Sequence, residues 1–225
     1  MTDVFACARA QIYYNSKRKP LAQVKRETGC SHIINGYLFN GSFQPVGWTV
    51  IDGKVISRDA YQDWGISIGS DGKPQMLTDR GGSFLSGVPL LKNGAKLERS
   101  LTPDVARSAA RTAVGWMPDG RICLWCDKTS LTREQLQNKL LGLGVADALM
   151  LDGGGSTQGI FPNGKVASSR KVPTMVLFWE ETHQEENTDL NWAGESGILT
   201  EAQLAEPEKA VTRRELAEIL HRLQK

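Results

Sequence analysis

The sequence predicts an α+β protein, in which a β-rich domain of mixed sheets with one or two packed helices precedes a small C-terminal helical appendage. Three observations support this prediction. Runs of β-branched and aromatic residues recur over the first 180 residues. Turn dipeptides that contain glycine separate these runs. After residue 180 the composition becomes first acidic and then helical in character.

Eight segments of the first 180 residues have the composition of strands. They are HIINGYLF, GWTVI, WGISI, SGVPLL, RTAVGWM, RICLWC, DALML and PTMVLFW. Five dipeptides that favour positive φ lie between apolar runs: Asp52-Gly53, Asp71-Gly72, Asn93-Gly94, Asp119-Gly120 and Asn163-Gly164. We expect each of them to form a hairpin turn between antiparallel strands.

Two helices are expected in the same domain. Thr132 and Gln135 form a capping box, which predicts the start of a helix. Three leucines then recur at helical spacing before two glycines stop the run: Leu136, Leu140 and Leu143, with Gly142 and Gly144. A second, shorter helix is predicted around residues 105–110.

Beyond the domain, which we place at residues 1–180, we expect a linker and a helical tail. Residues 181–189 carry several carboxylates and almost no apolar side chain, as a linker does. Residues 190–225 have helical character, with a second capping box at Thr212 and Glu215 and one apolar face. About 35 residues bury little core alone. We therefore expect the tail to dock on the domain, on a partner or on another copy, which would give a homo-oligomer.

The tail also resembles a known repeat. Its sequence, NWAGESGILTEAQLAEPEKAVTRRELAEILHRL, is similar to a single S-layer-homology-like helical repeat of the kind found at the ends of wall-associated and phage lytic proteins. This resemblance implies a Gram-positive phage or bacterial product and contact with cell-wall polymers.

Composition and charge exclude several classes of function. With 40% hydrophobic and 23% charged residues and a net charge of +2, the chain has no strong basic field, so no nucleic acid polymer is expected as a partner. No run approaches the roughly 20 apolar residues that span a bilayer, so no membrane partner is expected. The start, MTDVFACARAQIYY, lacks the uninterrupted apolar core of a secretion signal. We expect a cytoplasmic protein, released to the cell wall if a phage encodes it.

The most informative motif is ALMLDGGGSTQGI, in which Asp152 ends an apolar strand and precedes three glycines, Ser156 and Thr157. Three consecutive glycines are costly in chain entropy, so they indicate a sharp turn or the close approach of a ligand. An acid beside exposed backbone N–H groups suits a phosphate-bearing or hydroxylated ligand. A glycine-rich turn with a solvated Asp152 is an equal alternative. A divalent cation, Ca²⁺ or Mg²⁺, held by Asp152 and carbonyl oxygens is also left open.

Two further segments carry polar side chains that are candidates for ligand binding or catalysis. Arg111 opens an apolar strand, and an inward-facing arginine requires a carboxylate or phosphate partner, unless it faces solvent at the strand's start. The segment INGYLFNGSF places the amides of Asn35 and Asn40 beside Tyr37 and Phe39. Amides and aromatic faces are the groups that bind the hydroxyls and the C–H surface of a sugar.

Other motifs have less specific interpretations. Cys123 and Cys126 have C-x-x-C spacing, but residues three apart in a strand point to opposite faces, so we expect half-buried cysteines and not a metal site. The basic stretch KRKPLAQVKR at residues 17–26 is expected to be a solvated face, with binding of phosphate polymers as the alternative.

Five segments in order are similar to the phosphodiester glycosidase family: INGYLFN, SGVPLLKNG, ARTAVGWMPDGRICLW, LTREQLQNKLLGLGVADALMLDGGGST and SSRKVPTMVLF. The lysosomal member of that family removes N-acetylglucosamine from a phosphodiester. The resemblance covers about residues 30–180. It implies a hydrolase that separates a sugar from a phosphate-linked acceptor, acting on a small or polymeric sugar-phosphate substrate in a fold of mixed sheets and helices.

The resemblance also implies the site. Asp152, Arg111 and Asn35 fall at catalytic positions. The substrate-binding positions are Gly153, Gly154, Gly155, Ser156 and Arg170. From the two motifs themselves we add Thr157, Tyr37 and Phe39 as candidate substrate-binding residues. Family members usually read N-G-G-F-F where this chain has Asn35-Gly36-Tyr37-Leu38-Phe39. Tyr37 replaces a glycine of that pattern, so we expect its side chain to narrow the substrate site.

A mechanism follows as a hypothesis. Arg111 and Arg170 clamp the phosphate, and Asp152 acts on the sugar side, either as general base for water or by stabilising oxocarbenium-like charge. Asp127 is one candidate for a second carboxylate, and Asp119 is expected to be a turn residue.

We predict the first of the following three functions and keep the other two as alternatives. The first is cleavage of an N-acetylglucosamine-1-phosphodiester-like bond, for example the link between teichoic acid and peptidoglycan. The second is intracellular hydrolysis of a nucleotide sugar or a ribose-phosphate signalling molecule. The third is a non-catalytic module that sequesters a carbohydrate or nucleotide, and Tyr37 in place of a glycine is the feature that keeps this alternative open.

Overall fold

The computed structural model describes residues 1–59 and 61–181. The chain divides into two compact units, Met1–Glu181 and Thr182–Lys225, and the described residues belong to the first. The predicted helical tail and the predicted linker from residue 182 onward lie outside the described residues. Their structure and the oligomer they suggest therefore stay predictions.

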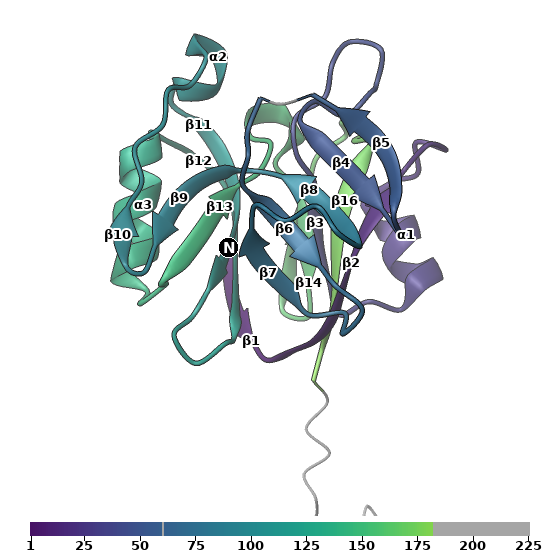
Figure 1. Cartoon of the computed structure of the whole chain (residues 1–225), viewed down its shortest axis with the longest axis horizontal. Coiled ribbons are helices and arrows are strands. Elements are labelled where there is room, and N and C mark those ends of the chain that lie inside the picture. The colour runs from purple at the N-terminus through teal and green to yellow at the C-terminus, as the bar shows by residue number, and fades with distance from the viewer. Residues whose placement is uncertain (60, 182–225) are drawn as a thin grey trace, which may run out of the picture. The chain divides into compact units, whose positions relative to one another are not determined.

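The described strands form three antiparallel sheets (Figure 1). Sheet 1 has the order β1 (Thr2–Phe5), β12 (Ile122–Leu131), β11 (Ala109–Trp116), β13 (Asp147–Met150), β9 (Val88–Lys92), β10 (Ala95–Lys96). Sheet 2 has the order β15 (Gly164–Val166), β14 (Gly159–Phe161), β3 (His32–Asn35), β16 (Thr174–Glu180), β2 (Cys7–Tyr14). Sheet 3 has the order β5 (Lys54–Arg58), β4 (Trp48–Ile51), β8 (Ser83–Ser86), β6 (Gly65–Ile68), β7 (Pro74–Leu77).

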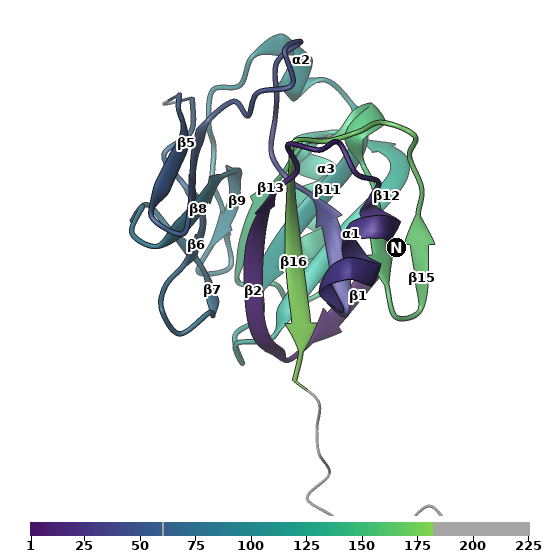
Figure 2. The same cartoon turned by 90° about the vertical axis from the view of Figure 1, so that its right-hand side faces the viewer.

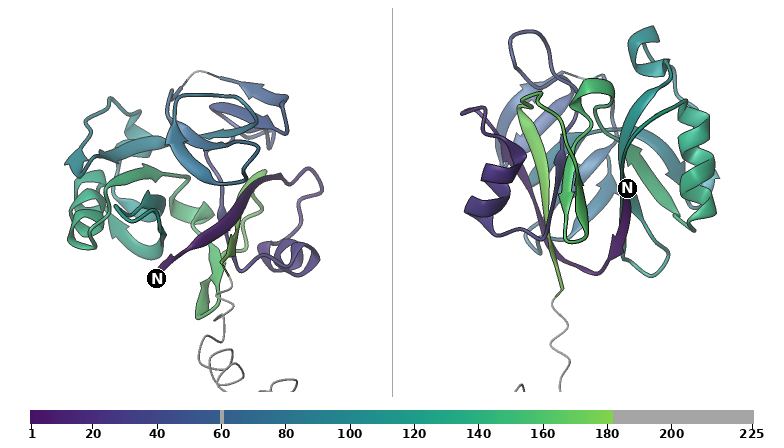
Figure 3. Two further views of the ribbon diagram at one scale, coloured as in Figure 1. Left: turned by 60° about the horizontal axis from the view of Figure 1, so that its bottom comes forward. Right: turned by 180° about the vertical axis from the view of Figure 1, so that it is seen from behind.

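Short helices cover the flanks of these sheets. Helix α3 (Arg133–Gly142) packs against β9 and β12, and α1 (Leu21–Thr28) packs against β3 and β14. Figure 3 shows these two helices on opposite sides of the sheets, and in Figure 2 α1 faces the viewer. A single turn, α2 (Pro103–Ala106), precedes β11. The predicted fold class, a β-rich domain with few short helices, is confirmed for the described residues.

The turn dipeptides behave as predicted. Each of the five connects two antiparallel neighbours: β4 to β5, β6 to β7, β9 to β10, β11 to β12 and β14 to β15. Asp52 and Asn93 themselves have positive φ, at 50° each, and the glycines that follow them are also left-handed. Such conformations match the twist of the paired strands.

The helix predictions were right in one case and partly wrong in another. The capping box at Thr132 and Gln135 forms in both directions and starts α3. The helix predicted around 105–110 is a single turn that ends at Ala106, because Ala109 and Ala110 already belong to β11, where Ala109 pairs with Leu131 of β12. Pairing within sheet 1 outweighs the helix propensity of these alanines.

Three elements were not predicted. The first residues form β1 and β2, which occupy the edges of sheets 1 and 2. Helix α1 overlaps the second half of the basic stretch and extends to Thr28, and only Leu21 and Val24 of it are buried. Two buried side chains in eight residues give only a weak helical periodicity. The segment was therefore interpreted from its basic charges as a solvated face and not as a helix.

One main core lies among the three sheets. It includes fully buried Ile34 from sheet 2, Leu85 from sheet 3 and Leu149 from sheet 1. Cys123 and Cys126, expected to be half-buried, are completely buried in β12, and burial raises the pKa of each thiol to about 11. None of the described helices is long and apolar enough to cross a membrane.

Candidate active site

The carboxyl end of β13 runs into the glycine-rich motif where sheets 1 and 2 meet. The N–H of Leu151 donates to the carbonyl of Thr112 at 2.9 Å, which continues the pairing with β11. The N–H of Asp152 donates instead to the carbonyl of Gly36, at 3.1 Å, just after β3 of sheet 2. Asp152 therefore lies at the junction between the two sheets.

Asn35 holds this junction together. It is fully buried, and its Nδ2 donates to the carbonyls of Gly36 and Asp152, at 3.0 and 2.8 Å. Its Oδ1 accepts from the Thr112 hydroxyl at 2.7 Å and from the Gln158 N–H at 3.1 Å. A carboxamide has two N–H donors and two acceptor lone pairs. Asn35 therefore uses its whole hydrogen-bonding capacity within the protein.

The glycines of the motif have steric reasons to be glycine. A Cβ at Gly153 would lie 2.6 Å from the carbonyl oxygen of Ala110. Gly154 has a φ of +58°, a region that side chains disfavour. The loop continues as a single 3₁₀ turn, Gly154–Ser156. The N–H groups of Gly154 and Gly155 have no acceptor among the described residues, so they can donate to an anion.

This geometry predicts the effect of adding one methyl group. We expect Gly153→Ala to lower the free energy of unfolding by about 2 kcal/mol, because the backbone must move away from the Ala110 carbonyl. Gly142→Ala is the matched control, since a Cβ there meets nothing within 4 Å and alanine favours the helix. It should raise stability by roughly 0.5 kcal/mol. Urea unfolding of the two variants measures both changes, and equal stabilities would contradict the close approach.

A cavity of about 450 Å³ opens against the glycine loop. Its size falls in the usual range for small-molecule sites. It is lined by the segment after β3, by α2 and the residues that follow it, by the end of β13 and by the segment before β16. The predicted site residues that line it are Tyr37, Phe39, Arg111, Asp152, Gly153, Gly154, Gly155 and Arg170.

Arg111 is a buried cation at the wall of this cavity. It is 3% exposed, and its guanidinium donates to the carbonyls of Leu131 at 3.0 Å, Val105 at 3.2 Å and Arg107. Burial, with the charge of Arg107, lowers its pKa. The inward orientation is confirmed, but within the described part of the chain its partners are carbonyls and no carboxylate. Two of its five N–H groups and its whole charge are left for a ligand.

Two more guanidinium groups lie over the glycine loop. The Nη1 of Arg170 is 3.4 Å from the Ser156 hydroxyl, and the Arg170 guanidinium carbon is 3.4 Å from where a Cβ of Gly155 would be. The Nη2 of Arg107 is 3.6 Å from the equivalent point at Gly154. Three arginines therefore surround the loop in which the N–H groups of Gly154 and Gly155 have no acceptor among the described residues. This arrangement suits a phosphate.

Asp152 is half-buried and lines the cavity. Its Oδ1 accepts the Gly153 N–H at 2.8 Å. Burial raises its pKa, although the Ser156 side chain, the Gly153 N–H and the positive charge of Arg170 act in the opposite direction. A carboxylate with a raised pKa can take up a proton near neutral pH more readily than a solvated one.

An aromatic wall faces these charges. Tyr37 is 2% exposed, and its hydroxyl has no hydrogen-bond partner among the described residues. Burial raises the pKa of Tyr37 far above its usual value, so the hydroxyl stays protonated. The Phe39 ring packs edge-on against Phe43, with ring centroids 5.7 Å apart, and the Arg170 guanidinium lies 6.0 Å from the Phe39 centroid.

Three predicted site residues do not line the cavity. Asn35, Ser156 and Thr157 are completely buried behind it. Asp127, the candidate second carboxylate, also lies away from it and accepts the Thr129 N–H at 2.7 Å. Their functional assignments stay predictions. Asp119 is a turn residue, as expected, and accepts the backbone N–H of Arg121 at 3.1 Å.

Two charged residues that line the cavity were missed in the sequence, Arg107 and Asp104. Both come from α2 and the residue after it, next to the place where the helix was predicted to continue. Asp104 is exposed and its pKa is lowered, chiefly by a hydrogen bond with Thr102. It is therefore an ionised carboxylate at the rim. The spacing of Arg107 and Arg111 was the available signal, but a helix over 105–110 gave it no functional meaning.

The carboxylates do not gather into a metal centre. Among the described residues, no group of three or more His, Cys, Asp or Glu side chains is close enough to hold a metal ion. A site built from Asp152 and carbonyl oxygens, as considered from the sequence, stays a prediction.

The fold and the site together define a class of protein. It is a β-rich α+β protein with a cavity lined by three arginines, one half-buried carboxylate and an aromatic wall. Such a cavity suits a ligand that carries phosphate and hydroxyl groups. Comparison with family models then matches residues 28–179 to the phosphodiester glycosidases. Because this match covers more than half of the chain, the protein belongs to the phosphodiester glycosidase family, a family of hydrolases.

Solved structures agree with this fold. The catalytic domain of zebrafish N-acetylglucosamine-1-phosphodiester alpha-N-acetylglucosaminidase, auto-inhibited by its pro-peptide, is similar with a TM-score of 0.62 and 22% identity, over 77% of this chain and 73% of that one. A hypothetical protein from Synechocystis is similar with a TM-score of 0.59 and 14% identity, over 76% of this chain and 56% of that one. A putative exported protein from Burkholderia pseudomallei is similar with a TM-score of 0.53 and 11% identity, over 76% of this chain and 71% of that one. Comparison with curated proteins finds no match.

Proposed function

We propose that this protein hydrolyses a sugar-1-phosphodiester, with the sugar side of the substrate at Asp152 and the phosphate at the arginines. The observation that carries the proposal is the buried Arg111, which faces the cavity without a carboxylate partner in the described chain and lies beside the glycine loop. A buried cation with spare N–H groups is stabilised by an anionic ligand. Membership of the phosphodiester glycosidase family supplies the bond type.

The phosphate side needs only charge stabilisation. When the bond between the anomeric carbon and the phosphate oxygen breaks, the electron pair stays on that oxygen. The acceptor leaves as a phosphomonoester with one more negative charge. Arg111, Arg170 and the N–H groups of Gly154 and Gly155 are fixed donors for this charge. Because phosphate leaves readily as an anion, a second acidic carboxyl is unnecessary.

The sugar side needs a group that activates water. Water adds to the anomeric carbon, and Asp152 accepts its proton in our account and then releases it to solvent. The products are a free sugar and a phosphomonoester. Asn35 supports this step without touching the substrate, because its side chain is saturated and holds the Asp152 carbonyl. We therefore propose Asn35 as a positioning residue.

The sugar ring is proposed to lie against Tyr37 and Phe39. The Tyr37 hydroxyl is a buried donor without a partner among the described residues, so a sugar hydroxyl that accepts from it satisfies both groups. In this chain a tyrosine replaces a glycine of the usual family pattern. The pocket should therefore accept a narrower range of sugars than a pocket with glycine at this position.

Tyr37→Phe tests this contact. We expect kcat/KM for the preferred substrate to fall about fivefold to tenfold, the effect of one neutral hydrogen bond. Stability should not decrease, because a buried hydroxyl without a partner is removed. Tyr14→Phe, at a half-buried tyrosine of β2, is the control and should leave kcat/KM unchanged. Unchanged kinetics of the Tyr37 variant would contradict the contact.

The finer substrate assignment is also a proposal. We propose that the sugar is N-acetylglucosamine and that the acceptor belongs to a cell-wall glycopolymer, because the family bond type and the resemblance of the tail point the same way. Mass spectrometry of products from a panel of sugar-1-phosphodiesters, nucleotide sugars and isolated walls tests it. Release of free sugar only from nucleotide sugars would place the substrate inside the cell. Tight binding without product would make the protein a sequestering module.

A further inference from the structure

A second hollow lies next to the active-site cavity and shares Arg170 with it. Its volume is about 190 Å³, and it lies between the start of α1, strand β15 and the segment 167–171. Three lysines line it: Lys19, Lys165 and Lys171. We call it the lysine groove. The function proposed above does not use these lysines.

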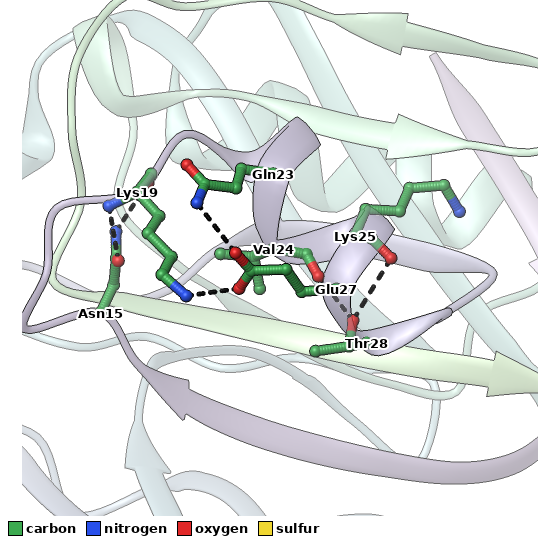
Figure 4. Close-up of polar contacts among 7 residues, drawn as sticks. All are labelled: Asn15, Lys19, Gln23, Val24, Lys25, Glu27 and Thr28. Carbon is green, nitrogen blue, oxygen red and sulfur yellow. Dashed lines mark hydrogen bonds and ion pairs between the residues drawn. The ribbon is translucent and has the colours of Figure 1, made fainter.

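The charge of the lysine groove is one-sided. Among the described residues that line it, none is acidic. Lys165 and Lys171 are exposed and form no ion pair with any described residue. Lys19 is partly neutralised, because its Nζ pairs with Glu27, which also accepts from Gln23 at 2.8 Å (Figure 4). The groove therefore has two uncompensated lysines besides Arg170.

The start of α1 adds backbone donors to the same place. Pro20 is the N-cap residue, it provides no side-chain cap, and the first turn contains no acidic residue. Leu21 and Ala22 line the groove, and their N–H groups have no acceptor in the described part of the chain. Unpaired N–H groups at a helix start attract anions. The backbone and the lysines favour the same kind of ligand.

The wall between groove and cavity is tied to the glycine loop. The Ser168 hydroxyl donates to the Gly155 carbonyl at 2.6 Å, and the Arg170 N–H donates to the same hydroxyl at 3.1 Å. The Gln158 side chain donates to the Arg170 carbonyl at 2.8 Å. Groove and cavity are therefore fixed relative to each other. Arg170 belongs to both, so an extended ligand that passes this residue would contact both hollows.

We propose that the lysine groove is a second anion subsite, which binds a further phosphate of the acceptor while the first phosphate lies at Arg111 and Arg170. This inference rests on the proposed function and narrows its substrate class to acceptors with more than one phosphate. A polyol-phosphate polymer and a small acceptor with two phosphates share this chemistry. The basic stretch, which the catalytic site did not use, gains a role through Lys19 and the start of α1.

The test separates the groove from catalysis by measuring binding without turnover. Calorimetry compares glycerol 1-phosphate, glycerol 1,3-bisphosphate and a six-unit oligo(glycerol phosphate) on the full chain. Wild type should bind the bisphosphate about tenfold more tightly than the monophosphate, and Lys165→Gln/Lys171→Gln should reduce this ratio to about two. Lys54→Gln/Arg58→Gln removes the same charge from exposed positions of β5 and should keep the ratio at ten.

Each outcome decides a point. The anion subsite would be contradicted if wild type bound the two glycerol phosphates with equal affinity. It would also be contradicted if both double variants lowered the bisphosphate-to-monophosphate affinity ratio equally. A ratio that falls only in the groove variant supports it, and tighter binding of the oligomer than of the bisphosphate identifies a polymer as the source. If wild type shows this pattern but cleaves no sugar-1-phosphodiester, the proposed function fails and the subsite stands.

Discussion

Asp152→Asn is expected to abolish turnover while leaving the protein at least as stable as wild type. The variant keeps the shape of the side chain and an acceptor for the Gly153 N–H, but it removes the group that takes the proton from water. We expect kcat to fall by about 10³–10⁴, the upper range for loss of a general base. This is the largest effect that the proposed mechanism predicts.

The stability of this variant follows from the direction of the pKa shift. Burial raises the pKa of Asp152 in the folded state above its unfolded value of about 3.9. The folded state then binds the proton more tightly, so wild type loses stability as pH rises through the window between the unfolded and the folded pKa. The amide of the Asp152→Asn variant does not titrate and carries no such loss. The variant should therefore match wild type below about pH 4 and be more stable at neutral pH.

Thermal unfolding between pH 4 and 8 and initial rates at pH 7 measure the two effects. The raised pKa also predicts that the acidic limb of kcat/KM for wild type lies above pH 4, because the base must be ionised. Asp71→Asn, in the exposed hairpin turn between β6 and β7, should change neither property. Full turnover by Asp152→Asn would contradict the mechanism.

Arg111→Lys is expected to have the second largest effect. Lysine keeps the positive charge but lacks the planar fork that donates to the carbonyls of Leu131, Val105 and Arg107 and to a phosphate at the same time. We expect kcat to fall about 10²-fold, as when one donor to a developing anion is lost. KM should change much less, because the charge that attracts the substrate remains.

The kinetic pattern distinguishes this role from a structural one. Loss of carbonyl contacts should also lower the free energy of unfolding by about 2 kcal/mol, so rates are compared at a temperature where circular dichroism shows the variant to be folded. Arg121→Lys, in the exposed turn before β12, is the control. A variant that is destabilised but keeps the wild-type kcat would show that Arg111 only supports the fold.

Local signals made much of the fold predictable. Turn dipeptides such as Asp52-Gly53 and Asn93-Gly94 determine their own backbone conformation, and the capping box at Thr132 does the same for the start of α3. Long-range pairing was not accessible in this way. Strand β1 pairs with β12, more than a hundred residues away, and no local pattern in the first residues identifies that partner.

The site was predictable to the extent that motifs carry its residues. Asp152 and its glycines stand out by composition, Arg111 stands out at the start of an apolar strand, and Arg170 came from the family resemblance. The sequence did not show which of these side chains reach the cavity. The Asn35 side chain uses all its hydrogen bonds within the protein and does not line the cavity, whereas Arg107 does. Such differences depend on which side of a backbone junction a side chain takes, and contacts between sheets 1 and 2 determine that.

The central claim is cleavage of the bond between the anomeric carbon and the phosphate oxygen, and isotope labelling tests it most directly. The protein is incubated with N-acetylglucosamine-1-phosphoglycerol in water enriched in ¹⁸O, and the products are weighed by mass spectrometry. Our account predicts one ¹⁸O in the released sugar and none in the glycerol phosphate. Label in the glycerol phosphate would show attack at phosphorus and would contradict the role given to Asp152.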